Sequence, residues 1–469
     1  MGTPKAVPAA LAVYAEKLHS EGKEFKVGLI TGGATGSQVD SALAQAHAVA
    51  FRTPFQSNKE MRNAINAGEV QYYDVHLSQI GQDVRYGFLG DIDVAIVEAS
   101  DITEEGDIVL STSVGISPTL IQVAHKVIIE LNEAHASKLT GMHDIYIPDA
   151  PPYRREIPIY RVNDRAGSIS VRVNPEKVVG VVRTNERDRI AAFTPLNDTT
   201  SRIGQNVADF LLGEYQRGAI PREFLPLQSG VGNIANAVLG ALGADKKLPA
   251  FSMYTEVIQN SVIDLMMQER IRFVAGSSLT LSDDRLDMLY DNIDVMKERV
   301  LLRPQEITNH PEMIRRLGII AVNTALEADI FGNVNSTHVL GSKMMNGIGG
   351  SADFARNAYL SIFTTPSTAK DGLISSIVPH VSHVDSTEHD VRILVTEQGV
   401  ADLRGKSPSQ RARCIIENCA HPDYKELLWD YLKLSEGKGC HTPMSLRNAL
   451  KMHIAFAETG DMRNTKFEM

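Results

Sequence analysis

Short runs of β-branched and aromatic residues recur along the chain, and each ends near glycine or a small polar residue before a stretch with helical spacing of apolar positions. The clearest runs are residues 25–31, 94–99, 251–255, 271–274 and 391–396. Strands that alternate with helices in this way are typical of crossover units, in which successive strands run parallel. The pattern therefore predicts an α/β protein with mostly parallel sheets.

A change in composition divides the chain. A Pro-rich stretch covers residues 148–155, and a charged segment covers residues 186–189, before a new helical pattern begins. Since domains commonly have about 100–200 residues, a chain of this length has room for more than one core. We predict two open α/β lobes, residues 1–190 and residues 191–469.

No apolar run approaches the roughly 18 residues that a membrane span needs, so we expect no membrane association.

Charge and cysteine content narrow the function classes. The chain has 469 residues, with 47 Lys and Arg against 57 Asp and Glu and a net charge of -10. That balance excludes the broad basic surface of a duplex nucleic-acid binder. The cysteines are Cys414, Cys419 and Cys440, too few for a disulfide framework, which indicates a reducing compartment: the cytoplasm, or the mitochondrial matrix in a eukaryote. Cys414 and Cys419 lack metal-ligand spacing, so we predict core packing there and no metal.

Three glycine-containing turns could approach an anion. Residues 32–36 follow a predicted strand but lack the dinucleotide or phosphate-loop spacing, which favours a plain turn. Residues 228–233 precede an apolar helical stripe, and residues 346–351 place three glycines in four positions before another helix. For these two turns, the residues alone fit a ligand contact and a structural loop equally well.

Two charged residues are further candidates. Glu256 follows a predicted strand, and we expect a helix over residues 257–269, whose N-terminus would favour an ionised, nucleophilic carboxylate; helix capping is the alternative. Lys370 lies in a loop of small residues, where its charge could meet a phosphate or simply solvate a turn. Asn335, Thr337 and His338 are expected to make turn hydrogen bonds.

Taken together, these segments resemble the acetyl-CoA hydrolase/transferase branch of the class I CoA-transferases, most closely its succinyl-CoA:acetate and propionyl-CoA:succinate members. The matching blocks occur in the same order over nearly the whole chain. They are QSGVGNIANA at 228–237, YTEV at 254–257, QEITNHPE at 305–312, NGIGGSADF at 346–354 and TEQGVADLRG at 396–405. Five blocks in one order are a much stronger signal than any single block.

The resemblance implies a role for particular residues. Glu256 would be the covalent nucleophile, Asn309 its amide partner, and Gly350 part of the oxyanion site, with this active site between the two lobes. Coenzyme A would serve as substrate and covalent intermediate, and the protein would be a homodimer. The implied CoA contacts are Gln228, Ser229, Gly230, Val231, Gly232, Leu326, Gly350 and Lys370.

The implied activity is a ping-pong CoA transfer between short-chain acyl-CoA and carboxylates such as acetate, succinate, propionate or butyrate. Two alternatives stay open: an acyl-CoA hydrolase, and a CoA-binding protein without catalysis. Relatives carry a strand and a Gly-rich turn before the motif PKAVP, which stands here at residues 4–8. We therefore expect the first lobe to lack an initial strand.

Overall fold

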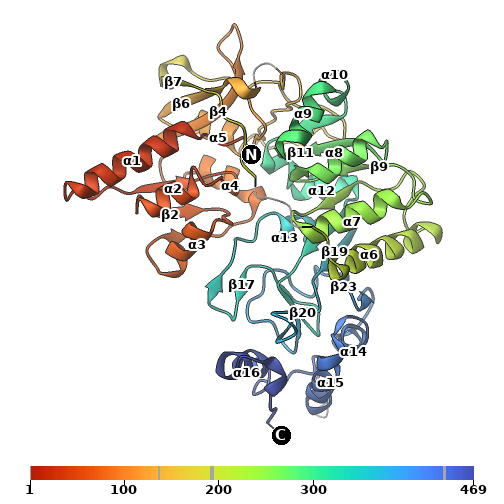
Figure 1. Cartoon of the computed structure of the whole chain (residues 1–469). Coiled ribbons are helices and arrows are strands. Elements are labelled where there is room, and N and C mark those ends of the chain that lie inside the picture. Colours follow the sequence, from red (N-terminus) through yellow and green to blue (C-terminus); the bar gives the residue numbers. More distant parts are fainter. Residues whose placement is uncertain (1, 136–137, 191–194, 437–439, 469) are drawn as a thin grey trace. The chain divides into compact units, whose positions relative to one another are not determined.

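The computed structural model describes residues 2–135, 138–190, 195–436 and 440–468 (Figure 1). The chain forms two compact units that interleave along the sequence. The first unit comprises Met1–Ala192, Ala250–Leu317 and Asn346–Asp353, and the second comprises Phe193–Pro249, Gly318–Met345 and Phe354–Met469. The units are defined by contacts in space, and the two sequence lobes divided at residue 190 stay a prediction.

The first unit contains three groups of strands that are largely parallel. Pairing is parallel within β1-β2-β3, between β4, β6 and β7, and between β9, β11 and β13, whereas β5 runs antiparallel to β4. These strands are β1 (Val27–Ile30), β2 (Val49–Thr53), β3 (Gln71–Tyr72), β4 (Val94–Ile102), β5 (Ile108–Leu110), β6 (Lys126–Asn132), β7 (Val178–Thr184), β9 (Phe251–Tyr254), β11 (Ile271–Gly276) and β13 (Val300–Leu302). A short parallel pair, β10 (Val257–Gln259) and β12 (Ser278–Thr280), completes the unit.

Helices connect these parallel strands. They are α1 (Ala6–Ser20), α2 (Asp40–Gln45), α3 (Lys59–Asn66), α4 (Leu77–Arg85), α5 (Ser117–Val123), α8 (Asn260–Met267), α9 (Asp283–Asp291), α10 (Ile293–Met296), α11 (Gln305–Thr308) and α12 (Pro311–Leu317). In α3, Asn58 caps the first turn because its side chain accepts the Met61 N–H, and Met61 and Ala64 are buried one turn apart. The helix therefore packs one apolar face against the core shared with α1 and α2.

The second unit has a sheet in the order β8-β14-β19-β23-β24, parallel except for its last strand. Its strands are β8 (Leu227–Ser229), β14 (Ile320–Thr324), β19 (Leu360–Thr364), β23 (Ile393–Thr396) and β24 (Gly399–Asp402). Smaller ladders join β15 (Glu327–Asp329) to β16 (Val334–Asn335) and β22 (Ile377–Val378), β17 (His338–Val339) to β18 (Lys343–Met344), and β20 (Thr368–Ala369) to β21 (Ile374–Ser375).

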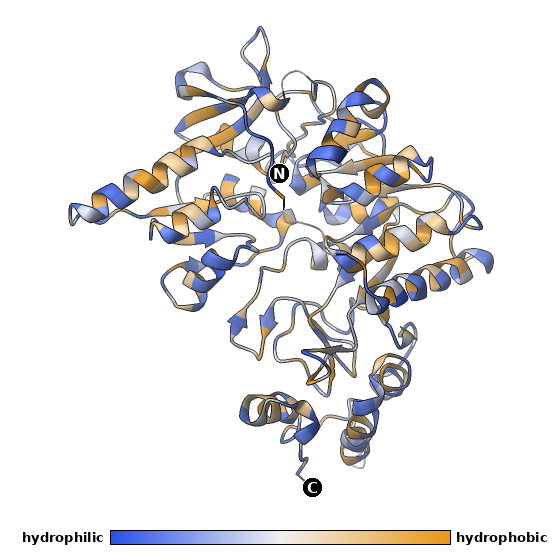
Figure 2. Cartoon of the chain, viewed as in Figure 1, coloured by the Kyte–Doolittle hydropathy of each residue, from blue (hydrophilic) through white to orange (hydrophobic). Residues whose placement is uncertain are grey.

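The helices of the second unit pack partly on these strands and partly on one another. They are α6 (Asp198–Gln216), α7 (Asn233–Ala244), α14 (Pro408–Cys419), α15 (Pro422–Glu436) and α16 (Lys451–Thr459), followed by the 3₁₀ turn η3 (Met462–Asn464); α13 (Ser351–Asn357) spans the boundary of the units. Apolar and polar residues alternate along α6 (Figure 2), where Ile203, Val207 and Leu211 are buried at four-residue spacing. Among the described helices, none is both long and apolar enough to cross a lipid bilayer.

The α/β class with mostly parallel sheets is confirmed, and a strand lies within or across each of the five predicted runs. Cys414 and Cys419 lie on α14, as expected, with Cys419 fully buried in the core and Cys414 packed against it. Asn335 also makes the expected turn, because its side-chain oxygen accepts the N–H groups of Thr337 and His338 at 3.1 and 2.9 Å.

Candidate active site

Glu256 lies in a bend between β9 and β10, and its side chain is partly buried. The Thr255 N–H donates to Ala275 O at 2.9 Å, and the Ser277 N–H donates to Glu256 O at 2.7 Å, so the backbone is held on both sides of the carboxylate. The predicted helix over residues 257–269 is wrong, because β10 comes first and α8 begins only at Asn260. A helix N-terminus therefore does not begin directly at Glu256.

Burial raises the pKa of Glu256 to about 7, while the Asn309 amide opposes this rise and the Asp353 carboxylate adds to it. Desolvation favours the neutral form of a carboxyl group. The ionised form of Glu256 is therefore a stronger base than the carboxylate of an exposed glutamate. A more basic carboxylate is also a better nucleophile. The surroundings of Glu256, and not a helix dipole, therefore set the basicity of its carboxylate.

Asn309 ends α11 and is fully buried. Tyr254, at the end of the strand that leads to Glu256, donates its hydroxyl to Ile307 O at 2.7 Å and so fastens α11 to β9. Thr308 Oγ1 donates to Asn309 Oδ1 at 2.8 Å, which fixes that oxygen as an acceptor. The Asn309 amide also lowers the pKa values of the Glu256 and Asp353 carboxylates.

Gly350 lies on a third segment of the chain, close to Glu256 and Asn309. A Cβ atom at this position would clash with Asn309 Nδ2 and would lie 2.7 Å from Glu256 Oε2. Only a residue without a side chain allows so close an approach of backbone and carboxylate. The preceding Gly349 has a φ of 62°, in the left-handed region, which turns the chain before α13. Glu256, Asn309 and Gly350, predicted separately along the sequence, thus meet within the first unit.

Asp74 and Ser78 form hydrogen bonds with the segment that contains Gly350. The Asp74 carboxylate accepts the Ile348 N–H at 2.9 Å, and Ser78 donates its N–H and hydroxyl to Asp353 at 3.0 and 2.6 Å. Burial raises the pKa of Asp353 to about 6, and the hydrogen bonds from Ser78 oppose this. Asp353 has no role that follows from the sequence alone, although it lies in the NGIGGSADF block. Asp74 and Ser78 lie in no motif that would have marked them as part of the site.

All of the predicted CoA contacts except Gly350 lie in the second unit. Residues 228–232 and Leu326 lie at or just beyond the ends of the neighbouring parallel strands β8 and β14. Gly230 follows β8, and its N–H donates to Val322 O of β14 at 3.1 Å. Gly232, with a φ of 104°, begins the turn into α7. Leu326 follows β14 and is 37% exposed, whereas Lys370 lies on the exposed turn between β20 and β21. Carboxyl ends of adjacent parallel strands are a common location for ligands in α/β sheets.

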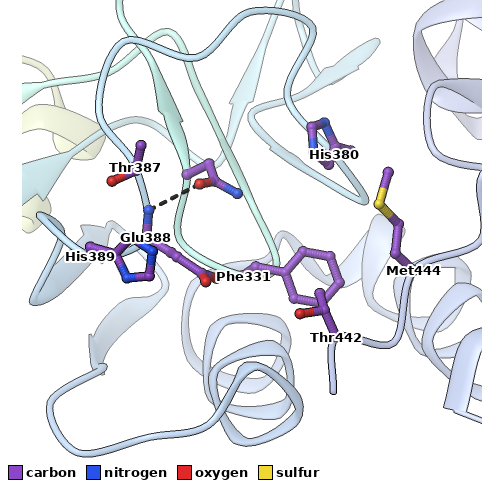
Figure 3. Close-up of a pocket in the computed structure, with 8 residues that line it drawn as sticks. Phe331, His380, Thr387, Glu388, His389, Thr442 and Met444 are labelled. Atoms are coloured by element: carbon purple, nitrogen blue, oxygen red, sulfur yellow. Dashed lines mark hydrogen bonds between the residues drawn. The ribbon is translucent and has the colours of Figure 1, made fainter. Parts of the chain in front are cut away.

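A separate surface pocket of about 240 Å³ lies in the second unit (Figure 3). Phe331 and Met444 supply apolar surface, and His380, Glu388 and His389 supply titratable groups. The dashed bond in Figure 3 joins the Glu388 N–H to Asn333 Oδ1 at 2.9 Å. Its described lining residues include none of those predicted for catalysis or for CoA.

One cluster among the described residues has the composition of a metal site. Single ligand atoms of Glu98, His135 and Asp188 lie within 4.8 Å of one another, and all three residues are buried. The Lys5 ammonium, however, forms ion pairs with both carboxylates of this cluster, at 3.1 Å in the case of Asp188. A cation already compensates these charges, so the arrangement is that of a buried ion-pair network. The absence of a metal requirement stays a prediction.

The raised pKa of Glu256 predicts an effect on stability. In the folded protein the Glu256 carboxyl group stays protonated up to a pH of about 7, whereas its ordinary pKa of 4.5 applies to the unfolded chain. The stabilisation from this proton is therefore complete below pH 4.5 and is lost as the pH rises through 7. Glu256→Gln, which keeps the shape but cannot ionise, should therefore increase the free energy of unfolding near pH 8 by at most about 3 kcal/mol.

Thermal unfolding of wild type and Glu256→Gln at about pH 4.5 and pH 8 measures this effect, with the exposed Glu298→Gln as control. We expect the two melting temperatures to coincide at the lower pH and to separate at the higher pH. Equal melting temperatures at both would contradict the raised pKa.

Comparisons with known proteins identify the family. The N-terminal domain of the acetyl-CoA hydrolase/transferase family matches residues 1–183, and its C-terminal domain matches residues 286–432. The chain is 49% identical to the propanoyl-CoA:succinate CoA transferase of Escherichia coli, over 98% of this chain and 93% of the relative. It is 46% identical to the acetyl-CoA hydrolase of Schizosaccharomyces pombe, over 99% and 91% of the two chains. The crystal structure of RipA from Yersinia pestis has a similar fold, with a TM-score of 0.70 at 23% identity and 93% coverage of each chain.

The α/β fold and these matches define an enzyme class that acts on acyl-CoA, either by transfer or by hydrolysis. The chain belongs to the acetyl-CoA hydrolase/transferase family.

Proposed function

We propose that this protein is an acyl-CoA:carboxylate CoA-transferase that works through a covalent Glu256–CoA thioester. The observation that carries the proposal is the meeting of a partly buried carboxylate of raised pKa, the Asn309 amide and the Gly350 backbone in one site. The identity to a propanoyl-CoA:succinate CoA transferase over almost the whole chain supports the same reading. A homodimer, implied by the resemblance, and a cytoplasmic location, indicated by the cysteines, belong to the proposal.

The first half-reaction replaces the acyl group's sulfur by a carboxylate oxygen. Ionised Glu256 attacks the thioester carbonyl carbon, the C–S bond breaks, and CoA leaves as a thiolate. The product is a mixed anhydride between Glu256 and the acyl group. The thiolate then attacks the glutamyl carbonyl of this anhydride, so that Glu256 becomes a CoA thioester and the first carboxylate is released.

The second half-reaction reverses these two steps with another carboxylate. The acceptor attacks the glutamyl thioester and expels CoA thiolate, and the thiolate then attacks the acceptor's carbonyl in the new anhydride. This produces the new acyl-CoA and returns Glu256 as a free carboxylate. Protons and electrons balance without a further reactant, because each step exchanges one nucleophile for another.

Every step passes through a tetrahedral intermediate with a negatively charged oxygen. The Gly350 backbone and the Asn309 amide lie against Glu256 and are suited to stabilise charge that develops at the glutamyl carbonyl. Contacts of this type contribute on the order of 3 kcal/mol each to the transition state.

A hydrolase is the second candidate, because an acetyl-CoA hydrolase is 46% identical over nearly the whole chain. Hydrolysis would use the same first steps, with water in place of the acceptor carboxylate. The test is to supply acyl-CoA with and without acetate or succinate. A transferase forms a new thioester only when the acceptor is present, whereas a hydrolase releases free thiol regardless of it.

Intact-mass analysis after incubation with acyl-CoA, followed by peptide mapping, tests the covalent scheme. We expect one CoA adduct per chain, located on the peptide that contains Glu256 and removed by added carboxylate. An adduct on another residue, or turnover without any adduct, contradicts the scheme. Binding of CoA without adduct and without turnover would instead support the non-catalytic CoA-binding alternative.

A further inference from the structure

The turn that carries Lys370 has an unusual backbone. Between β20 and β21, Lys370, Asp371 and Gly372 have φ values of 48°, 55° and 86°, and the Leu373 N–H donates to Lys370 O at 3.1 Å. The left-handed region is easy for glycine but unfavourable for residues with a Cβ atom, such as lysine and aspartate. Such a turn persists only where its surroundings hold it.

The C-terminal elements of the second unit hold this turn. Tyr424, buried on α15, donates its hydroxyl to Gly372 O at 2.7 Å, and the Met462 N–H of η3 donates to Leu373 O at 3.0 Å. The sulfur of Met462 lies 3.3 Å from the Ser375 nitrogen, on the returning strand. Three contacts from residues after position 420 therefore fix the backbone beneath Lys370.

The lysine side chain is also held. Its ammonium lies 5.0 Å from the centroid of the Phe456 ring on α16, within the range of a cation–π contact. Phe456 is partly buried, and Lys370 is exposed, so one side of the ammonium faces the ring while the group stays accessible. A lysine whose rotamers are already restricted loses less side-chain entropy when it binds an anion.

The same helix also reaches the neighbourhood of Leu326. His453, one turn before Phe456, has its Nε2 2.7 Å from a carboxylate oxygen of Glu327, and Glu327 follows Leu326 directly. The other carboxylate oxygen of Glu327 accepts hydrogen bonds from Asn335 and Ser382. One face of α16 is thus fixed close to two of the proposed CoA contacts, Leu326 and Lys370. The match to the family's C-terminal domain ends at residue 432, before α16 begins.

We propose that α16 is a positioning element for CoA binding, in which Phe456 holds the Lys370 ammonium ready to meet a phosphate of CoA. The proposal rests on the proposed function, which assigns Lys370 to CoA. Phe456 is a positioning residue: it acts through Lys370 and does not touch the reacting atoms. Its effect should fall on CoA affinity and leave the chemical steps at Glu256 unchanged.

The test compares CoA binding by calorimetry with steady-state kinetics. Phe456→Leu keeps apolar volume but removes the ring, and we expect it to raise the Kd of CoA and the KM of acyl-CoA about three- to tenfold. Turnover number should stay within about twofold, because uniform binding affects KM alone. Phe456→Tyr, which keeps a ring face, should restore affinity, and Ile454→Ala, exposed on the same helix, is the matched control.

A double variant separates positioning from a general loss of structure. In a Lys370→Met background, Phe456→Leu should weaken CoA binding no further, because the ring then has no ammonium to hold. An equal loss in both backgrounds, or a lower melting temperature with unchanged Kd, overturns the proposal. Unaltered CoA affinity in Lys370→Met, with Glu256 still labelled, also overturns it and leaves the proposed function standing. Wild type that binds no CoA would instead reject the proposed function itself.

Discussion

Glu256→Ala is expected to lower the rate of CoA transfer by at least about 10⁴-fold, because it removes the group that forms both covalent intermediates. No other carboxylate is expected to replace it: Asp353, the neighbour that influences its pKa, is held by two hydrogen bonds from Ser78. The measurement is the initial rate of new thioester formation from acyl-CoA and acetate. Binding of CoA should persist, since the proposed CoA contacts lie in other segments of the chain.

Two further variants make the outcome specific. Glu256→Asp keeps the carboxylate but withdraws it by one methylene, roughly 1.5 Å, and a displacement of this size should cost about 10²-fold or more. Glu298→Ala removes an exposed glutamate from the same unit and should leave the rate unchanged. Normal turnover in Glu256→Ala would rule out the covalent scheme.

The strand pattern could be read from the sequence because it depends on local features. The run at residues 251–255 predicted β9, which the structure places at Phe251–Tyr254, since buried strands need apolar β-branched and aromatic residues. The helix expected directly after Glu256 does not form, because local spacing does not decide the structure there. Residues 257–259 pair with β12, and this tertiary pairing overrides the helical spacing that the sequence suggests.

The site could be predicted in part, as separate motifs. Glu256, Asn309 and Gly350 each stood in a recognisable block, but their proximity depends on how the blocks pack, which no single block encodes. The sequence suggested activation by a helix N-terminus, whereas burial raises the pKa of Glu256. Desolvation depends on residues remote in sequence, so it could not be inferred from the neighbours of Glu256 along the chain.

The positioning residues were the least predictable. Phe456 lies 86 positions after Lys370, and neither residue carries a motif for the other. Similarly, Ser78 and Asp353 are separated by 275 positions, and only the fold brings the donor to the carboxylate. Hydrogen bonds and ring contacts of this kind are set by tertiary packing, and a serine or phenylalanine can make them from many sequence contexts.

Gly350→Ala is expected to reduce the turnover number by about 10²-fold while changing the affinity for CoA little. The added Cβ would clash with Asn309 Nδ2 and would lie 2.7 Å from Glu256 Oε2, so both groups must move away from the place where the tetrahedral oxygen forms. Steady-state kinetics gives the turnover number, and calorimetry with CoA gives the affinity. An unchanged turnover number would count against any role for Gly350 at the oxyanion.

Gly349→Ala is the matched control, because the two glycines are adjacent but differ in what a side chain would meet. At Gly349 the nearest atoms to a Cβ are carbons of the Phe55 ring at 3.5 Å, an ordinary contact, but the φ of 62° disfavours alanine. That strain, on the order of 1–2 kcal/mol, should lower the melting temperature. Gly350→Ala is expected to act chiefly on turnover and Gly349→Ala chiefly on stability. Equal loss of turnover in both variants would mean that the loop is merely disordered, because only Gly350 faces the carboxylate.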